Sequence, residues 1–489
     1  MTHRLILLAT LVLWQVTPAY RARQLIAEGA GLISQGRFTE AEAKFRDAVQ
    51  ANPADIDAVV NLGVALFRQG KFGESIPFFQ QGASQRPQDP AVHNDLAQAY
   101  IRTGRPHDAV VEMARACDLD PGNASYHRYL GDMMSEAGQR EAAEKQLRLA
   151  LKLDPKSADA SLSLARLYIK EDRKSDAGRL YHASLELNPR QVDARRELGE
   201  LCSTEGNYRS AQTEFRSALA LDPGNAVLHQ DLGSALLKAG EPEPAASELR
   251  TAIRLDPSLG PAHRDLGLAL RDQGNVEGAL QAFHRAAELL PADSSVHYML
   301  SQTLRRAGKA QDAAAEATIA EQLSRKEKQA PLIAAYANEG LFLIDKGRPQ
   351  EALAKIKQAL DLDPSNPSTQ FDYALALRHA GRYDESIVAW QKVLLKQPDL
   401  PGAYYQLGYD YFEKGRYAEA VASFTRAAQL YPGNADVHNG LGVALERSGD
   451  SPHAAEQIEL AQKLAPRNLQ YQRNLDCIRR QLAGCTLRP

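Results

Sequence analysis

Six of the twelve histidines in this sequence share one spacing, because each lies six residues after a proline. They are His93, His127, His229, His263, His297 and His438. Imidazole is the commonest metal ligand in proteins, so a recurring histidine raises the question of a metal site. One histidine per 34 residues puts successive rings on different helical hairpins, about 10 Å apart, whereas zinc ligands all lie about 2 Å from one ion. We therefore expect these histidines to pack between helices, with no metal and no cofactor.

Motifs of the common catalytic classes are missing from the sequence. It contains no His-Glu-x-x-His, phosphate-loop or Gly-x-Ser-x-Gly pattern. Gly29-Ala30-Gly31 is a fragment of a dinucleotide fingerprint, but it lies in a helical stretch with no strand before it. The expectation is a protein that is not an enzyme, with no catalytic residues.

The elements that position these residues follow from a proline that returns every 34 residues. The prolines are Pro53, Pro87, Pro121, Pro155, Pro189, Pro223, Pro257 and Pro291, followed after 73 residues by Pro364, Pro398, Pro432 and Pro466. A fixed period of this size is typical of stacked repeat architectures.

Other positions of the repeat have equally regular residue types. A small residue such as Gly63 lies ten residues after each proline, where it lets a first helix press closely on a second. A glycine seventeen residues before the next proline ends the first helix in a left-handed cap, with Asp172 as the exception. A large residue such as Phe79 lies eight residues before the next proline, on the buried face of the second helix. Asp or Asn two residues after the proline, as in Asp55, caps the next helix.

This sequence resembles the tetratricopeptide repeat family, whose 34-residue unit has small, aromatic, alanine and proline positions in this order. The resemblance covers about residues 22–468 and about thirteen units. It implies an all-α fold, a right-handed superhelical solenoid of helix-turn-helix units with a concave groove lined by the first helices. A binding scaffold is the implied function.

Four segments are predicted along the chain. Residues 1–19 have a short basic start, an apolar run and an acceptable cleavage site, which is the layout of a secretory signal peptide. Repeats one to nine occupy residues 20–330, and repeats ten to thirteen occupy 331–468. The boundary is drawn at the irregular polar stretch 324–329, where the chain has five residues more than the period requires. Residues 469–489 contain a cap helix and a tail.

Composition narrows the partners and the location. The formal net charge of −3 gives no global basic excess, so nucleic acid is not expected. No membrane span is expected once the signal peptide is removed, and the mature protein is expected to be exported, to a periplasm or outside the cell. Of the four cysteines, Cys477 and Cys485 are close enough in sequence for a disulfide, and whether they are bridged stays open.

The groove supplies the candidate binding residues. In this family three positions of the first helix, at i, i+4 and i+7, face inward as one stripe. The stripe is apolar or aromatic in the second array at Phe371, Tyr405, Tyr409 and Phe412, and it carries arginines in the first array at Arg128, Arg196 and Arg264. Packing within the array and pairing with acids are the alternatives for these residues.

Two functional hypotheses remain open. One is a non-enzymatic scaffold that binds a protein or peptide segment in the groove, in a cell-envelope assembly. The other is a carbohydrate-binding or polysaccharide-export accessory protein, because aromatic stripes also stack on sugars, which makes a glycan the alternative ligand.

Overall fold

The computed structural model describes residues 18–480 and residue 487. These residues form helices and no strand. The helices are α2 (Pro18–Ser34), α3 (Phe38–Ala51), α4 (Ile56–Arg68), α5 (Phe72–Gln85), α6 (Pro90–Arg102), α7 (Pro106–Leu119), α8 (Ala124–Glu136), α9 (Arg140–Leu153), α10 (Ala158–Lys170), α11 (Lys174–Leu187), α12 (Val192–Thr204), α13 (Tyr208–Leu219), α14 (Ala226–Lys238), α15 (Pro242–Leu255), α16 (Gly260–Asp272), α17 (Val276–Leu289), α18 (Ser294–Arg306), α19 (Ala310–Asp345), α20 (Pro349–Leu362), α21 (Pro367–His379), α22 (Tyr383–Lys396), α23 (Pro401–Glu413), α24 (Tyr417–Leu430), α25 (Ala435–Ser448), α26 (Ser451–Leu464) and α27 (Leu469–Arg480). The all-α fold and the helix-turn-helix repeats are as predicted.

Positions within a repeat are counted here from its reference proline, so that Gly63 is at position 10 and Phe79 at position 26 of the repeat after Pro53. The first and tenth repeats have no such proline, so they are counted from residues 19 and 330, which lie 34 residues before Pro53 and Pro364. "Helix A" and "helix B" denote the first and second helix of each repeat.

Helix ends follow the predicted signals. Asp55 accepts a hydrogen bond from the backbone N–H of Asp57 at the start of α4, and Asn225 accepts from Val227 and Leu228 at the start of α14. The glycines at position 17 have positive φ, and Asp172, the predicted exception, has φ 56°. These caps satisfy backbone groups that the helices leave unpaired.

The core of each repeat depends on a small residue facing a large one. A Cβ added to Gly63 would lie 2.9 Å from the ring of Phe79, so only glycine allows helices A and B to approach this closely. Position 26 is occupied by a large, buried side chain in twelve repeats: Phe45, Phe79, Met113, Leu147, Tyr181, Phe215, Leu249, Phe283, Ile356, Trp390, Phe424 and Ile458.

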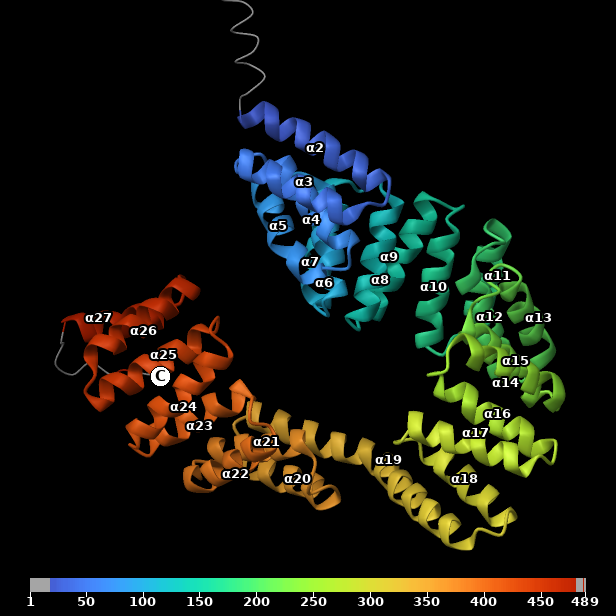
Figure 1. The fold of residues 1–489 in the computed structure, drawn as a ribbon. Helices are drawn as coiled ribbons and strands as arrows, with labels where there is room; N and C mark the ends of the chain where they lie inside the picture. The colour runs from blue at the N-terminus through green and yellow to red at the C-terminus, as the bar shows by residue number, and fades with distance from the viewer. Residues whose placement is uncertain (1–17, 481–486, 488–489) are drawn as a thin grey trace, which may run out of the picture. The chain divides into compact units, whose positions relative to one another are not determined.

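The chain divides into two compact units, with the division between Pro291 and Ala292. The N-terminal unit contains α2–α17, and the C-terminal unit contains α18–α27. Within each unit the hairpins stack in chain order, which Figure 1 follows from blue to red. Each unit is therefore a solenoid of helical hairpins, in which a repeat packs on its neighbours.

Helix α19 differs from the other helices by its length of 36 residues. It combines helix B of the ninth repeat with helix A of the tenth, so residues 324–329, predicted as an irregular boundary, are helical and Pro331 lies inside the helix. The two arrays predicted to meet at residue 330 thus share this helix, whereas the compact units meet at Pro291. No helix among the described residues is long and apolar enough to cross a membrane.

The C-terminal end matches the prediction of a cap helix. Helix α27 buries Tyr471, Leu475 and Ile478 against the last repeat, in the same cluster as Ile458. Cys477 is disulfide-bonded, whereas Cys117 and Cys202 are free. Cys485, the candidate partner that the sequence left open, lies outside the described residues, as does the predicted signal segment up to residue 17.

Candidate functional site

The four predicted aromatic residues lie together in the C-terminal unit, on helices α21 and α23. Phe371, Tyr405, Tyr409 and Phe412 are half-buried and pack against one cluster of buried residues. Phe371 meets Trp390 edge-to-face, with ring centroids 4.7 Å apart. Position and packing therefore fix these rings as one surface, which we call the aromatic stripe.

The two tyrosines of the stripe brace each other. Their ring centroids are 5.0 Å apart and the ring planes are nearly perpendicular. Both rings also make edge-to-face contacts with Phe424 of helix B. The hydroxyl of Tyr405 donates to that of Tyr409 over 3.3 Å. Burial raises the pKa of both phenols, so they stay neutral donors and acceptors at physiological pH.

A buried ion pair lies beside the stripe, and the sequence patterns did not single it out. Arg378 covers the ring of Tyr409 at 4.6 Å and donates to Gln406 over 2.6 Å. Its Nε lies 3.5 Å from Oδ1 of Asp410, a side chain that is 0% exposed. Neither Asp410 oxygen has a hydrogen bond of regular geometry, although the side chains of Ser386 and Trp390 are close enough to affect its pKa. Burial raises the pKa of this carboxyl to about 6, although hydrogen bonding with Ser386 and the charge of Arg378 oppose the shift.

The three predicted arginines lie in the N-terminal unit, and each has an acidic partner. Arg128 pairs with Asp132 at 3.0 Å in α8, and Arg264 with Asp265 at 3.0 Å in α16. Arg196 connects two repeats, because it reaches Glu200 in its own helix α12 at 2.6 Å and Asp231 in α14 at 2.8 Å.

Other contacts of the same kind join the A helices of the N-terminal unit. Arg166 of α10 reaches Glu197 of α12 at 2.6 Å, and Gln230 of α14 donates to Asp265 of α16 over 3.4 Å. We call these side chains, Gln230 and the arginines with their acidic partners on α8, α10, α12, α14 and α16, the polar ladder. Burial raises the pKa of its carboxyls Asp132, Glu200 and Asp231, with the arginines opposing the shift. Its ionic groups largely neutralise each other.

The recurring histidines connect their own reference prolines to the rest of the repeat. His93 places Nε2 3.2 Å from the carbonyl oxygen of Pro87 and Nδ1 2.6 Å from Glu112 of helix B. His127, His229 and His438 make the same pair of contacts with their own prolines and with Gln146, Glu248 and Gln457. With both ring nitrogens engaged, these histidines have the packing role that was predicted.

An arginine confirms how this position works. Arg195 lies six residues after Pro189 and donates Nε to its carbonyl over 3.1 Å and Nη1 to Glu214 over 3.0 Å. Arginine thus makes the same two contacts as histidine at this position, and these contacts do not depend on a metal-ligating lone pair.

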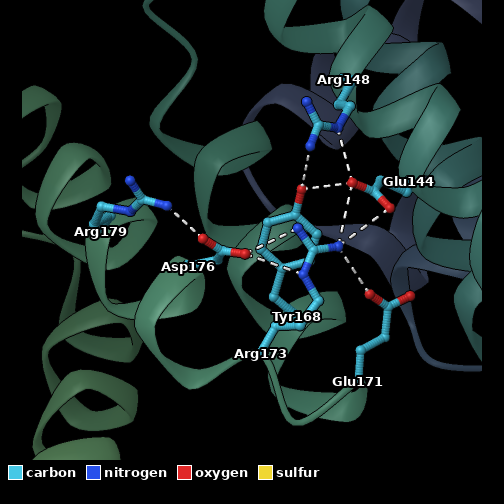
Figure 2. Close-up of polar contacts among 7 residues, drawn as sticks. All are labelled: Glu144, Arg148, Tyr168, Glu171, Arg173, Asp176 and Arg179. Atoms are coloured by element: carbon cyan, nitrogen blue, oxygen red, sulfur yellow. Dashed lines mark hydrogen bonds and ion pairs between the residues drawn. The ribbon is translucent and has the colours of Figure 1, made fainter.

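Helices α9–α11 and their connections carry a polar network of seven residues, drawn in Figure 2. Tyr168 donates its hydroxyl to Glu144 over 2.7 Å, and the guanidinium of Arg173 lies 3.6 Å from its ring centre. Arg173 also pairs with Asp176 at 2.9 Å, beside a hollow of about 480 Å³. The stacking itself recurs at Arg105 on Tyr100 and at Arg416 on Tyr411. The network thus elaborates a structural contact of the repeat.

The geometry defines a helical repeat protein whose A helices carry a half-buried aromatic surface. Two family models match almost the whole repeat region: the Cilia and flagella-associated protein 70 C-terminal domain over residues 21–264, and the tetratricopeptide repeat over 264–328, 338–402 and 405–468. The chain belongs to the tetratricopeptide repeat family.

The chain is also similar to several solved structures. A tetratricopeptide repeat protein from Parabacteroides merdae is 19% identical over 51% of this chain and 99% of its own, with a TM-score of 0.43. The Cut9–Hcn1 hetero-tetramer of APC/C gives 13% identity, 95% and 98% coverage and a TM-score of 0.36. YrrB, titled a TPR protein with an unusual peptide-binding site, is 20% identical over 37% of this chain and 92% of its own, with a TM-score of 0.34. No curated protein matches.

Proposed function

We propose that this chain is a non-enzymatic interaction scaffold that binds a protein or peptide segment on the aromatic stripe. The observation that carries the proposal is the stripe itself: Phe371, Tyr405, Tyr409 and Phe412 are each only partly buried, while packing against one core cluster fixes their positions. Half-buried aromatic residues beside an arginine are the residue types in which binding energy concentrates. The tetratricopeptide fold supports a scaffold role.

The geometry of the rings favours a peptide over a glycan. Stacking on a sugar uses the flat face of an aromatic ring, but Arg378 covers a face of Tyr409 and Phe424 lies against both tyrosines. The two hydroxyls and the guanidinium of Arg378 instead offer hydrogen bonds to a peptide backbone or an acidic side chain. The arginines of the polar ladder contribute to binding only where a partner replaces their present acids.

A place in a cell-envelope assembly is part of the same proposal. It rests on the signal-like layout of residues 1–19, which makes the mature chain begin at Tyr20. An exported scaffold would meet its peptide partner outside the cytoplasm.

The test selects peptides by display on the full chain and measures their affinity by fluorescence anisotropy. Combining Tyr405→Ala with Tyr409→Ala is expected to weaken binding by about 2 kcal/mol or more, because a hot-spot pair is truncated. Tyr431→Ala is the matched control, since that tyrosine is 54% exposed and lies off the stripe. Unchanged affinity in a double variant that melts like the parent would remove the stripe from the function. Binding in a glycan array instead of peptides would favour the carbohydrate alternative.

A further inference from the structure

The ninth repeat lacks the large side chain that fills position 26 of every other repeat. It has Ala317 there, and a hollow of about 670 Å³ opens between α18 and α19, lined by Ala317, Ala320 and Tyr298 among others. Tyr298 is 57% exposed in this hollow. The side of this hairpin that would receive the next repeat is therefore uncovered.

The tenth repeat is uncovered on the opposite side. Positions 5, 9 and 12 of helix A pack on the preceding repeat elsewhere, as Ala403, Leu407 and Asp410 do, all buried. In the tenth repeat these positions hold Ala335, Glu339 and Phe342, all of them exposed, with Phe342 at 56%.

The first described repeat, formed by α2 and α3, shows the same polar residue at position 9. There Glu28 pairs with Lys44 at 2.6 Å, just as Glu339 pairs with Lys355 at 2.9 Å. Helix A of the tenth repeat thus has the exposed face of an array edge, with a phenylalanine added.

The sizes of the two uncovered positions are complementary. Position 12 packs in one buried cluster with position 26 of the preceding repeat, as for Phe45 with Ala65, Ile356 with Ala376 and Phe424 with Ala444. In these pairs the preceding repeat supplies the large residue and the following repeat the small one, whereas three other repeats also have a large residue at position 12: Met133, Leu167 and Leu201. At Ala317 and Phe342 the order is reversed, so Phe342 has the size that the hollow beside Ala317 lacks.

The two faces of one chain cannot meet while α19 is a continuous helix. Ala317 and Phe342 are 25 residues apart on it, which is about 38 Å at 1.5 Å per residue. The tetratricopeptide repeat match leaves out residues 329–337, in the middle of this helix. The same contact is available between two chains, because exchange of identical elements needs no new surface.

We propose that a second copy of this chain occupies the hollow, in a reciprocal exchange in which Phe342 of each copy packs beside Ala317 of the other. The interface is a further example of the hairpin-to-hairpin contact that the chain already makes between its other repeats. It buries Tyr298 and Phe342, two of the exposed large apolar side chains of the C-terminal unit. This inference does not depend on the aromatic stripe.

Sedimentation of the full chain over a range of concentrations tests the proposal, with a reversible dimer as the expected result. Phe342→Ala and, separately, Ala317→Phe should each weaken dimerisation at least about tenfold, one by removing the filling side chain and the other by overfilling the hollow. Combining the two restores the usual size order and should recover dimerisation. Leu395→Ala is the control, because Leu395 is 87% exposed on α22 and lies outside both faces. A monomer at every concentration, or a dimer that is insensitive to Phe342→Ala, would overturn the exchange.

A cysteine pair distinguishes exchange between chains from closure within one chain. Ala317→Cys with Phe342→Cys is introduced after the free cysteines Cys117 and Cys202 have been replaced by serine. Exchange predicts a covalent dimer on oxidation, since the two positions meet only across chains. A disulfide-linked monomer would mean that α19 breaks near Pro331 and the repeats close in one chain, which contradicts the proposal.

Discussion

At the scale of the residue, the unusual side chain beside the aromatic stripe is Asp410. It occupies position 12, where the neighbouring repeats have Ala376 and Ala444, and it is completely buried. Its carboxylate lies beside Arg378, whose guanidinium in turn covers Tyr409. Asp410 therefore holds an arginine of the candidate site in place, at the cost of burying an ionisable group.

Replacing Asp410 by asparagine is expected to make stability less dependent on pH. The pKa of this carboxyl rises from 3.8 to about 6 on folding, so the folded state binds the proton more tightly than the unfolded state. Stability is then highest below about pH 4, falls as the pH rises to about 6, and loses about 3 kcal/mol in total. Asp410→Asn should therefore unfold at a higher urea concentration than the parent at pH 8 and at a similar one at pH 4.

Trp390 belongs to the buried cluster beneath the aromatic stripe, so its fluorescence reports the urea-induced unfolding of this region. A lower urea midpoint for Asp410→Asn at pH 8 would show that the pairing with Arg378 outweighs the cost of burial. Arg378→Gln provides the reciprocal variant, which should be destabilised most at pH 8, where Asp410 is charged.

At the scale of the element, each hairpin depends on how closely its helices approach. Phe424 lies between two glycines: a Cβ on Gly408 of its own repeat would be 2.8 Å from the ring, and a Cβ on Gly440 of the next repeat 2.9 Å. One aromatic ring thus fixes two helix spacings, and the tyrosines of the stripe rest on the same ring.

Gly408→Ala is expected to destabilise the C-terminal unit by about 1–3 kcal/mol, because the new methyl group overpacks against a ring that cannot move away. Thermal unfolding followed by circular dichroism measures this change. Gly433→Ala serves as the matched control, since a Cβ there meets nothing within 4 Å. Equal melting temperatures for the two variants would contradict this account of the helix spacing.

Most elements could be predicted from the sequence because each repeat position has a local physical reason, such as the cap at Asp55 or the left-handed turn at Asp172. The continuity of helix α19 could not be predicted, because its polar middle part resembles a loop in composition. Lysine, glutamate and glutamine, which make up much of that part, also favour helices. The aromatic stripe followed from the family resemblance, which gives the inward-facing positions, together with helical spacing. The acidic partners of Arg196 and Arg378 could not be predicted, because Asp231 and Asp410 are more than 30 residues away in sequence.

At the scale of the whole molecule, contacts between neighbouring repeats make stability a local property. The middle of α19 has no buried residue between Ala320 and Ile333, and it includes Pro331, which cannot donate a helical hydrogen bond. This segment is therefore expected to open more readily than the hairpins on either side.

Brief trypsin treatment should cut first after Arg325, Lys326 or Lys328, which are exposed in that segment. Cleavage there leaves one protected fragment that ends near residue 325 and one that begins near residue 329. Mass spectrometry of the early products identifies the cuts. First cuts elsewhere, with residues 324–331 intact, would show that α19 is as stable as the hairpins.

The reversed pair at Ala317 and Phe342 also limits how such a gene can grow. Repeat arrays lengthen by duplication. At most joints, an inserted copy places its small position 12 against a large position 26 of the repeat before it, and its large position 26 against a small position 12 of the repeat after it, so the original pairing is kept. A standard repeat inserted after the ninth would set its small position 12 against Ala317 and its large position 26 against Phe342. Such a copy would leave a void at one joint and a clash at the next. Duplication of a repeat can therefore lengthen the array on either side of this joint, but not at the joint itself.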